Sequence, residues 1–355
     1  MRSKPELPPL VLRADADAER GTGHVMRCLA LAQAWQSRGG KAVFITRCDS
    51  AALRERIVIS GSDLISLPRA GSVRADIETT LAQLSTRKAA FLALDGYDID
   101  VEQQEIFRAA GHLLLVIDDT AHLDRYEADI LLNQNLGAAK LTYRCSSGTT
   151  LLLGPHYALL RREFLSWRDR TRAVPDIAIK ILVTLGGSDP SNYTAQVIDA
   201  LLRLGTPGLE ARVVVGFANR HLPELAGRAE TLGPKTQLLT HVSDMAELMV
   251  WADLAVVATG STCWELACLG LPALGVIVAE NQRRIAEELH RLEILENLGW
   301  HDEVSVKSLA AAIGSLQSSC SRRLRMSERG RALIDGRGAE RVAQALFDRS
   351  CRRAA

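Results

Sequence analysis

LVLRADADAERGTGHVMRCLALAQAW, residues 10–35, changes from one secondary-structure pattern to another within a single stretch. The apolar run at 10–12 has the size of a buried strand, and it ends in a loop of aspartates and glycines. Apolar residues then recur at helical spacing, which predicts a helix over about 24–38. Strand, loop and helix in this order form the repeating unit of an α/β fold.

The same unit recurs along the first half of the chain. Short apolar runs between helical or turn segments predict buried strands at 10–15, 42–46, 64–67, 91–96, 113–119 and 129–135. Continuous apolar strands that alternate with helices are typical of a parallel sheet covered on both faces. A charged, proline-containing segment at about 161–178 interrupts this alternation, and we interpret it as a connector.

The alternation restarts after the connector, with strands predicted at 177–187, 211–216, 236–241, 254–259 and 272–278. A chain of 355 residues is too long for one ordinary core. We therefore predict two doubly wound, parallel-sheet (Rossmann-like) α/β domains, at 8–165 and 176–318. Helices are predicted at 319–355, and in two-lobed proteins such terminal helices often cross back to the first domain.

The composition excludes several classes of function. Apolar residues make up 47% of the chain and charged residues 24%, and the formal net charge is +1. Charges of both signs are interspersed, which gives no indication of a nucleic-acid surface. The apolar runs are too short to span a membrane, and we see no signal-peptide pattern. Seven cysteines without a CxxC pair and eight dispersed histidines predict reduced thiols, a cytoplasmic location and no metal site.

The loop GTGHVMR, residues 21–27, is the first candidate site. Gly21 and Gly23 allow a ligand to approach the backbone closely, and the helix start offers free N–H groups. His24 lies in the first helical turn, where the helix dipole disfavours an imidazolium, so a neutral imidazole can act as a general base. The alternative is a histidine that only packs beside a tight turn. Asp15 and Asp17 just before the loop, together with a second domain of the ligand-binding type, shift the balance towards function.

The segment LGGSDPSN, residues 185–192, is the second candidate site. Asp189 is a natural N-cap residue and Pro190 a natural first helical residue, so the segment predicts a helix start. Capping alone does not require the pair Gly186 and Gly187. Two glycines suit a backbone that touches a phosphate or a sugar.

The third candidate site is ATGSTCWELACLGLPAL, residues 258–274. Gly260, Ser261 and Thr262 end a predicted strand and open a helix, so their N–H groups and hydroxyls form a small anion cradle. Glu265 follows Thr262 by three residues, which is capping-box spacing, and on spacing alone capping is favoured over a bond to a ribose. Asn281 is expected to begin another helix nearby.

Several polar residues follow apolar runs of the first half and form a weaker signal: Asp95, Asp118, Asp119 and Asn135. Each alone is typical of a turn or a cap. Together they are suited to line a pocket for a hydroxylated or amidated sugar. Tyr157 has helical spacing with Leu160 and Phe164, which favours a place in the core.

The motifs RADADAERGTGHVMRCLALA, LDGY, IDD, DILLNQN, HYALLRREF, LGGSDPSN, GSTCWELACLGLP and AENQ come in this order over about residues 10–290. Together they resemble the UDP-sugar hydrolase family of pseudaminic acid biosynthesis, the PseG family, which is related in fold to the peptidoglycan glycosyltransferase that makes lipid II. The resemblance implies the two-lobed GT-B architecture with UDP in the C-terminal lobe. It also implies metal-independent, inverting hydrolysis of UDP-2,4-diacetamido-2,4,6-trideoxy-β-L-altropyranose at the anomeric carbon, without a cofactor.

The resemblance assigns roles to individual positions. It implies that His24 is the catalytic base or positions the water. It places the sugar near residues of the first domain: Asp15, Gly21, Gly23, Arg27, Asp95, Tyr97, Asn135 and Tyr157. It places UDP near residues of the second: Gly186, Gly187, Ser188, Asp189, His241, Val242, Gly260, Ser261, Thr262, Glu265, Asn281 and Gln282. In this assignment Glu265 binds the ribose.

Two other functions remain open at this stage. A GT-B glycosyltransferase would use the same donor lobe together with an acceptor site. A non-catalytic protein would bind the nucleotide sugar without turning it over. In each case we expect a small-molecule nucleotide sugar as the partner, and a monomer or weak oligomer.

Overall fold

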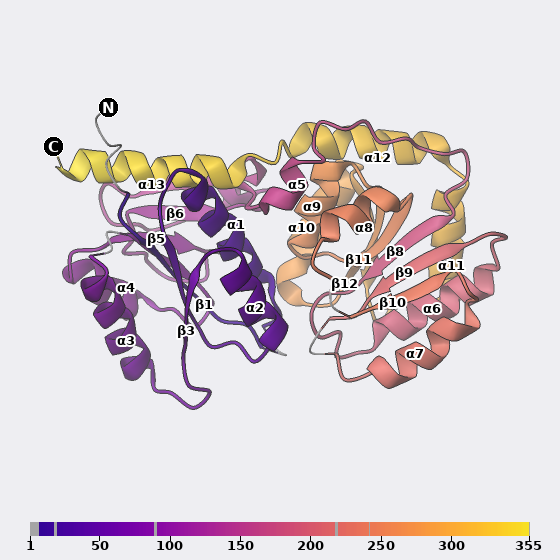
Figure 1. Ribbon diagram of the computed structural model, residues 1–355. Coiled ribbons are helices and arrows are strands. Elements are labelled where there is room, and N and C mark those ends of the chain that lie inside the picture. The colour runs from indigo at the N-terminus through magenta and orange to yellow at the C-terminus, as the bar shows by residue number, and fades with distance from the viewer. Residues whose placement is uncertain (1–6, 18–19, 89–90, 217–218, 241, 355) are drawn as a thin grey trace. The chain divides into compact units, whose positions relative to one another are not determined.

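In the computed structural model, a parallel sheet forms the centre of the first half of the chain (Figure 1). The structure describes residues 7–354 except 18–19, 89–90, 217–218 and 241. The sheet has the order β3-β2-β1-β4-β5-β6-β7, and each neighbouring pair is parallel. Its strands are β1 (Leu10–Ala14), β2 (Ala42–Thr46), β3 (Asp63–Ser66), β4 (Phe91–Asp95), β5 (Leu113–Ile117), β6 (Ile130–Asn133) and β7 (Thr150–Leu153).

The first four helices of this half each connect two successive strands from β1 to β5, as is usual for parallel pairing. Three of them begin at a capping side chain, because Ser50, Ser72 and Asp100 each accept a hydrogen bond from the backbone three residues on. The helical segments are α1 (Gly23–Ser37), α2 (Ala51–Ile59), α3 (Val73–Thr86), α4 (Val101–Ala109), η1 (Ala138–Lys140), η2 (Pro155–Tyr157) and α5 (Arg162–Leu165).

The second half has its own parallel sheet, in the order β10-β9-β8-β11-β12-β13. Its strands are β8 (Lys180–Thr184), β9 (Glu210–Val214), β10 (Thr236–Leu239), β11 (Leu254–Ala258), β12 (Ala273–Ile277) and β13 (Leu295–Trp300). The helical segments are α6 (Tyr193–Leu204), α7 (Leu222–Thr231), α8 (Met245–Trp251), α9 (Thr262–Leu269), η3 (Glu280–Gln282), α10 (Arg283–Arg291), α11 (Val306–Gln317), α12 (Cys320–Leu333) and α13 (Gly338–Ala354). Both sheets are Rossmann-like, as the alternating pattern predicts.

The chain divides into two compact units, 1–162 with 337–355, and 163–336. The segment 319–355 is therefore shared, because α12 packs on α9 of the second unit and α13 packs on α1 of the first. Close packing fixes the start of α13: a Cβ on Gly338 would lie 2.2 Å from the carbonyl oxygen of Ala158. The connector also differs from a free linker, since the Arg172 guanidinium donates to backbone carbonyls of the second unit.

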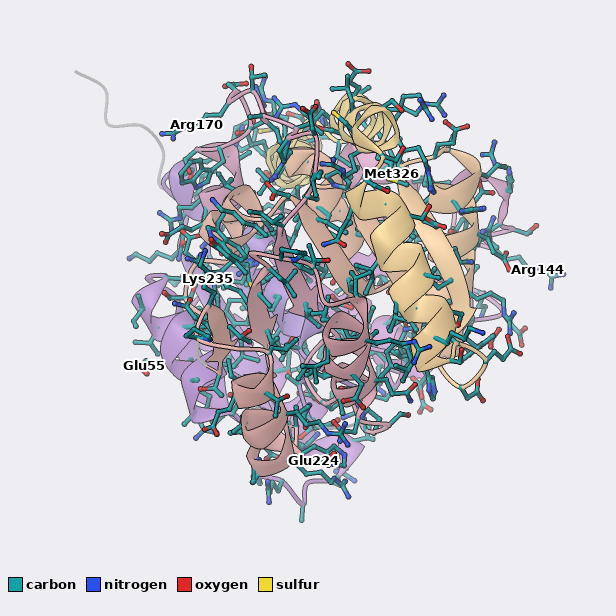
Figure 2. All side chains as sticks on the ribbon, turned by 90° about the vertical axis from the view of Figure 1, so that its right-hand side faces the viewer. Glu55, Arg144, Arg170, Glu224, Lys235 and Met326 are labelled. Carbon is teal, nitrogen blue, oxygen red and sulfur yellow. The ribbon has the colours of Figure 1, made fainter. Side chains whose placement is uncertain are left out.

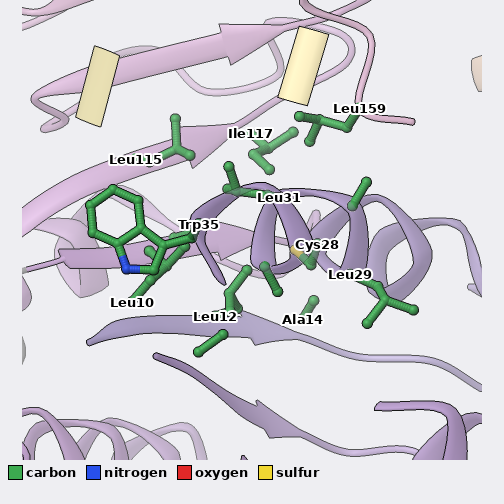
Figure 3. Packing of buried hydrophobic residues seen from close by; sticks show 14 of the residues in the cluster. Leu10, Leu12, Ala14, Cys28, Leu29, Leu31, Trp35, Leu115, Ile117 and Leu159 are labelled. Carbon is green, nitrogen blue, oxygen red and sulfur yellow. The ribbon is translucent and has the colours of Figure 1, made fainter. Parts of the chain in front are cut away.

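The first unit has two hydrophobic clusters, one that includes α1 and α13 and another that includes Leu84 of α3 and Phe107 of α4. Figure 3 shows Leu10 and Leu12 of β1 beside Leu31 and Trp35 of α1, and all four side chains are fully buried. Val342 and Leu346 of α13 belong to the same cluster. Charged side chains such as Glu55 and Lys235 extend from the ribbon in Figure 2 and are exposed. No helix in the described part of the chain is long and apolar enough to cross a bilayer.

Two edge strands lie outside the segments in which we predict strands. β7 pairs only with β6, and β13 pairs only with β12. An edge strand has one neighbour and is often partly solvated, so its sequence need not be a continuous apolar run. The sequence of β13, LENLGW, includes a charged residue, an amide and a glycine with φ +95°. Because of these polar and glycine positions, the sequence of β13 does not show the continuous apolar run by which a buried strand is predicted.

Candidate active site

His24 lies in the first turn of α1, directly beyond the carboxyl end of β1. Gly21 bends the approach to the helix with φ +73°, a conformation that favours glycine. The N-cap residue, Thr22, makes no side-chain capping bond. His24 is 8% exposed, so its imidazole lies almost wholly inside the first unit.

Asp95, the last residue of β4, orients this imidazole. Its Oδ1 lies 2.6 Å from Nδ1 of His24, and the Asp95 side chain is fully buried. Burial alone would raise the pKa of Asp95, but the charges and hydrogen bonds of Arg27 and His24 hold that pKa well below its ordinary value. An ionised carboxylate only accepts, so Nδ1 must carry the proton and Nε2 the lone pair. No described residue bonds to Nε2 of His24.

Arg27 joins Asp95 to a second carboxylate. Its Nε donates to Oδ2 of Asp95 at 2.5 Å and its Nη2 to Oδ1 at 2.6 Å, which is the two-pronged pairing typical of arginine. Its Nη1 lies 2.8 Å from both oxygens of Asp119. Burial would lower the pKa of Arg27, but Asp119 and Asp95 raise it. The guanidinium is thus engaged by two carboxylates within its own unit.

Asp119 accepts hydrogen bonds from two further residues of the predicted sugar site. Nδ2 of Asn135 donates to its Oδ1 at 2.8 Å, and the hydroxyl of Tyr97 donates to its Oδ2 at 3.2 Å. The Tyr97 ring meets the His24 ring edge-on, with 5.2 Å between centroids. His24, Arg27, Asp95, Tyr97 and Asn135 therefore form one cluster, with Asp119 as the shared acceptor that the sequence signals only weakly.

A neighbouring pair extends the cluster on the other side of Tyr97. The His122 ring lies 5.7 Å from the Tyr97 ring, and its Nδ1 lies 2.9 Å from Oδ2 of Asp118. The hydrogen bond that His122 donates to Asp118 raises the pKa of His122 against the opposing effect of partial burial. The hydroxyl of Tyr126 also donates to Asp118. The sequence does not single out His122 or Tyr126, since neither belongs to a recognisable motif.

Other predicted sugar residues of the first unit have different surroundings. The carboxylate of Asp15 pairs with Arg13, and Oδ1 accepts the backbone N–H of Arg47 at 2.6 Å. Asp95, and not Asp15, is the residue that contacts His24. Gly23 is the first residue of α1. Tyr157 is partly buried against the cluster that includes α1 and α13, although residues 158–161 are not helical and its spacing to Leu160 and Phe164 is therefore not that of one helix.

In the second unit, the double glycine follows β8 and is packed against the end of β9. Gly186 has φ +90°, and a Cβ on this residue would have no neighbour within 4 Å. A Cβ on Gly216 would lie 2.2 Å from the carbonyl oxygen of Gly187. Gly216 therefore fixes the path of the Gly186–Gly187 loop, a role that no sequence motif indicates.

The helix after this loop begins later than the sequence predicts. The N-cap residue of α6 is Asn192, so Asp189 is not the N-cap and Pro190 is not the first helical residue. Asp189 reaches forward instead, and its two oxygens accept the backbone N–H groups of Tyr193 and Thr194 at 2.9 Å each. The loop accommodates this with φ +41° at Asp189 itself. Ser188 precedes it and is partly exposed.

The loop between β11 and α9 presents free backbone donors. Within the described residues, the N–H groups of Gly260, Ser261 and Thr262 donate to no other group. The N-cap residue is Ser261, with no side-chain capping bond, so Thr262 is not the cap that the predicted capping box with Glu265 requires. Glu265 lies in the first turn and is partly exposed.

Gln282, in the segment after β12, lies beside Gly260 of the loop between β11 and α9. A Cβ on Gly260 would lie 3.8 Å from Nε2 of Gln282. Oε1 of Gln282 accepts the backbone N–H of Val278 at 3.1 Å, which holds the amide at the end of β12. Asn281 is the residue before it in η3. Val242 is partly exposed after β10, whereas His241 lies outside the described residues.

Acidic, histidine and cysteine side chains do not gather into a metal centre in the described ranges. No group of three or more of them there could hold a metal ion. The cluster around His24 offers carboxylates, a guanidinium and an imidazole, which are groups suited to acid–base chemistry.

The second half of the chain is similar to a known family of domains. Residues 181–342 match the model of the glycosyltransferase family 28 C-terminal domain. The UGT2 of Phytolacca americana, solved in complex with UDP-2-fluoro-glucose and pterostilbene, resembles this chain with a TM-score of 0.66 at 13% identity, over 96% of this chain and 99% of that one. The chain has a GT-B glycosyltransferase-like fold built from two Rossmann-like domains.

Two relatives are similar to this chain in sequence and carry names that describe a process or a reaction. The spore coat polysaccharide biosynthesis protein SpsG of Bacillus subtilis is 27% identical over 94% of this chain and 96% of its own length. The pseudaminic acid cytidylyltransferase and UDP-2,4-diacetamido-2,4,6-trideoxy-β-L-altropyranose hydrolase of Helicobacter pylori is 24% identical over 64% of this chain, which covers 40% of that protein. The chain is thus similar to one protein named for spore coat polysaccharide biosynthesis and to another named for steps that involve pseudaminic acid and a UDP-sugar.

Proposed function

We propose that this chain is a metal-independent, inverting hydrolase of a UDP-activated diacetamido-trideoxy sugar. The products are UDP and the free sugar, which would supply pseudaminic or a related nonulosonic acid. The observation that carries the proposal is the pairing of His24 with Asp95. It leaves a lone pair on Nε2 of a largely buried imidazole, which is what a general base needs.

In the proposed step, a water oxygen forms a bond to the anomeric carbon while the bond from that carbon to the UDP oxygen breaks. Nε2 of His24 takes the proton of the water. The imidazolium that forms is stabilised by the carboxylate of Asp95 at 2.6 Å from Nδ1. Attack on the face opposite to the leaving group inverts the anomeric configuration.

The second unit supplies a suitable site for the leaving diphosphate. The N–H groups of Gly260, Ser261 and Thr262 have no partner among the described residues, and they lie at the N-terminus of α9, which carries a partial positive charge. Donors fixed in place before the reaction stabilise charge as it develops on the leaving group. We assign the diphosphate to this loop and to Gly186 and Gly187.

The remaining predicted contacts complete the proposed UDP site. Ser188, Val242, Glu265, Asn281, Gln282 and His241 are assigned to the nucleotide, with Glu265 on the ribose. Asp189 is assigned a supporting role, because both of its oxygens hold the start of α6. The Helicobacter pylori protein, whose name includes this hydrolysis, supports the choice of a diacetamido altrose donor.

A glycosyltransferase is the second candidate, and two comparisons favour it. The matching family model describes glycosyltransferases, and the Bacillus subtilis relative over nearly the whole chain is named for polysaccharide biosynthesis. A base at His24 would serve a sugar hydroxyl as well as a water. The two functions share the base and the donor site and differ in the nucleophile.

UDP release separates the candidates. The full chain is incubated in H₂¹⁸O with a panel of UDP-sugars, and proton NMR follows the anomeric signal. Release from the diacetamido altrose donor, with ¹⁸O at the anomeric carbon and the inverted anomer first, supports the hydrolase. Release only after an acceptor glycan is added, with no ¹⁸O in the product, overturns it in favour of the transferase.

The His24→Gln variant tests the base itself. We expect a loss in turnover of about 10²–10⁴-fold with UDP affinity unchanged by calorimetry, because the base contributes to the chemical step and not to nucleotide binding. Wild-type turnover in this variant would contradict the assigned role. UDP binding without turnover of any donor by the wild type would indicate a non-catalytic binding protein.

A further inference from the structure

We infer that Asp119 is a positioning residue that strengthens His24 as a proton acceptor, acting through Arg27 and Asp95. The mechanistic part of this inference rests on the proposed role of His24 as a base. The effect of Asp119 on the protonation of the imidazole does not rest on that role, because it follows from charges inside one unit.

Four side chains from separate parts of the first unit form a continuous line. His24 and Arg27 lie on α1, Asp95 ends β4, and Asp119 follows β5. Asp119 bonds to Nη1 of Arg27 at 2.8 Å, Arg27 bonds to Asp95 at 2.5 and 2.6 Å, and Asp95 bonds to His24 at 2.6 Å. Asp119 thus contacts the guanidinium on the side away from Asp95.

The charges along this line favour a proton on His24. Two carboxylates and one guanidinium carry a net charge of minus one when the imidazole is neutral, and zero when it is protonated. Without Asp119, the full charge of Arg27 would be balanced by Asp95 alone. Asp95 would then stabilise an imidazolium less, and an unbalanced cation would lie 3.2 Å from Nδ1 of His24.

The other groups around His24 do not reverse this balance. From the loop after β4, Tyr97 presents its ring edge-on and is neutral at physiological pH. From α1, Cys28 lies 3.7 Å from Oδ2 of Asp95, and burial raises its thiol pKa, so it stays uncharged. His122, beyond Tyr97, pairs with Asp118, and the charge of Asp119 adds to the rise in the pKa of His122. Glu19 lies outside the described residues.

Charge and shape make opposite predictions for two substitutions of Asp119. Asp119→Asn keeps the size of the side chain and removes the charge, whereas Asp119→Glu keeps the charge and alters the shape. If Asp119 only held the loop in place, the asparagine variant would be the milder of the two. If its charge acts on His24, the glutamate variant is the milder one.

The experiment is a titration of the histidine rings in the full-length protein by ¹H–¹⁵N NMR, with His24→Gln used to assign the His24 signals. We expect the His24 titration to move to lower pH in Asp119→Asn and to stay near wild type in Asp119→Glu, because only the first variant removes a negative charge from the line. The same spectra report whether Nδ1 remains protonated in the neutral ring, which shows that Asp95 still holds it.

Glu78→Gln is the matched control, since it removes one negative charge from an exposed position on α3 of the same unit. We expect no shift in this variant. An unchanged His24 titration in Asp119→Asn, or an equal fall in Asp119→Glu, overturns the inference. With substrate, the acidic limb of the pH–kcat profile should move to lower pH in Asp119→Asn only. The titration stands apart from turnover, so failure of the proposed hydrolase would leave its result interpretable.

Discussion

Oδ1 of Asp95 lies 2.6 Å from Nδ1 of His24, although 71 residues separate them in the chain. The contact exists because β1 and β4 are neighbours in the sheet, with Ala14 in register with Asp95. The loop after β1 therefore delivers His24 beside the last residue of β4. A parallel sheet places the carboxyl ends of its strands at one edge, and ligands bind there in open α/β folds.

Asp95→Asn is expected to impair catalysis by reversing the imidazole tautomer. An asparagine can donate its amide N–H to Nδ1, which leaves the proton on Nε2 and removes the lone pair that would accept a proton from water. We expect a fall in kcat of about 10²–10⁴-fold. Calorimetric UDP binding should be unchanged, since the Asp95 contacts lie within the first unit.

The control for Asp95→Asn is the NMR signature of the ring nitrogens of His24. It should show Nδ1–H in the wild type and Nε2–H in the variant. Full activity together with a reversed tautomer would refute the role of His24 as a base.

Gly260→Ala is expected to weaken UDP binding with little change in stability. A Cβ at this position has its nearest neighbour at 3.8 Å, so the fold has room for it, and the backbone is not left-handed. The methyl group would occupy space beside the free N–H groups of the loop. We expect a rise in the Kd for UDP of about tenfold by calorimetry, or about 1.4 kcal/mol.

Gly216→Ala is the matched comparison, because its Cβ would lie 2.2 Å from the carbonyl oxygen of Gly187. Backbone must move to admit it, so we expect a lower melting temperature as well as weaker UDP binding. If Gly260→Ala binds UDP like the wild type, the assignment of the diphosphate to that loop is wrong.

The pair of His122 and Asp118 is expected to make stability depend on pH. The pKa of His122 is raised by its hydrogen bond to Asp118, with burial opposing, so folding favours its protonated form. Its contribution is fully present below the unfolded-state pKa of about 6.5, and it is lost as the pH rises through the higher folded-state value.

Calorimetric melting of the wild type and of His122→Gln at a series of pH values measures this contribution. The difference between the two melting temperatures should be largest at about pH 5.5 and should shrink towards about pH 9. A difference that stays constant with pH would show that His122 stabilises the unit by packing alone. Its partner Asp118 has a pKa below its ordinary value because its bonds to His122 and Tyr126 outweigh its own burial, so it stays ionised over this range.

Much of the fold is readable from local pattern. The strands of each sheet centre are continuous apolar runs because both faces are covered, and β1, β4, β5 and β11 are buried along their whole length. β13 lacks this pattern, because its sequence, LENLGW, includes a charged residue and a glycine, and so it escapes prediction. β7 escapes prediction although its sequence, TLLL, is mostly apolar, and its first two residues are exposed. The start of α6 also differs, because Asp189 bonds to N–H groups four and five residues ahead instead of serving as the cap.

The candidate site is readable in its parts and not in its connections. The sequence alone determines that His24 begins a helix after a glycine loop, and that acids follow the apolar runs of the first half. Only the tertiary structure decides that Asp95 pairs with His24, that Arg27 is enclosed by two carboxylates, and that Asp15 is engaged by Arg13 and Arg47. The physical reason is range: helix and strand patterns follow from neighbours in the chain, whereas hydrogen bonds between buried charges depend on which strand ends the sheet order brings together.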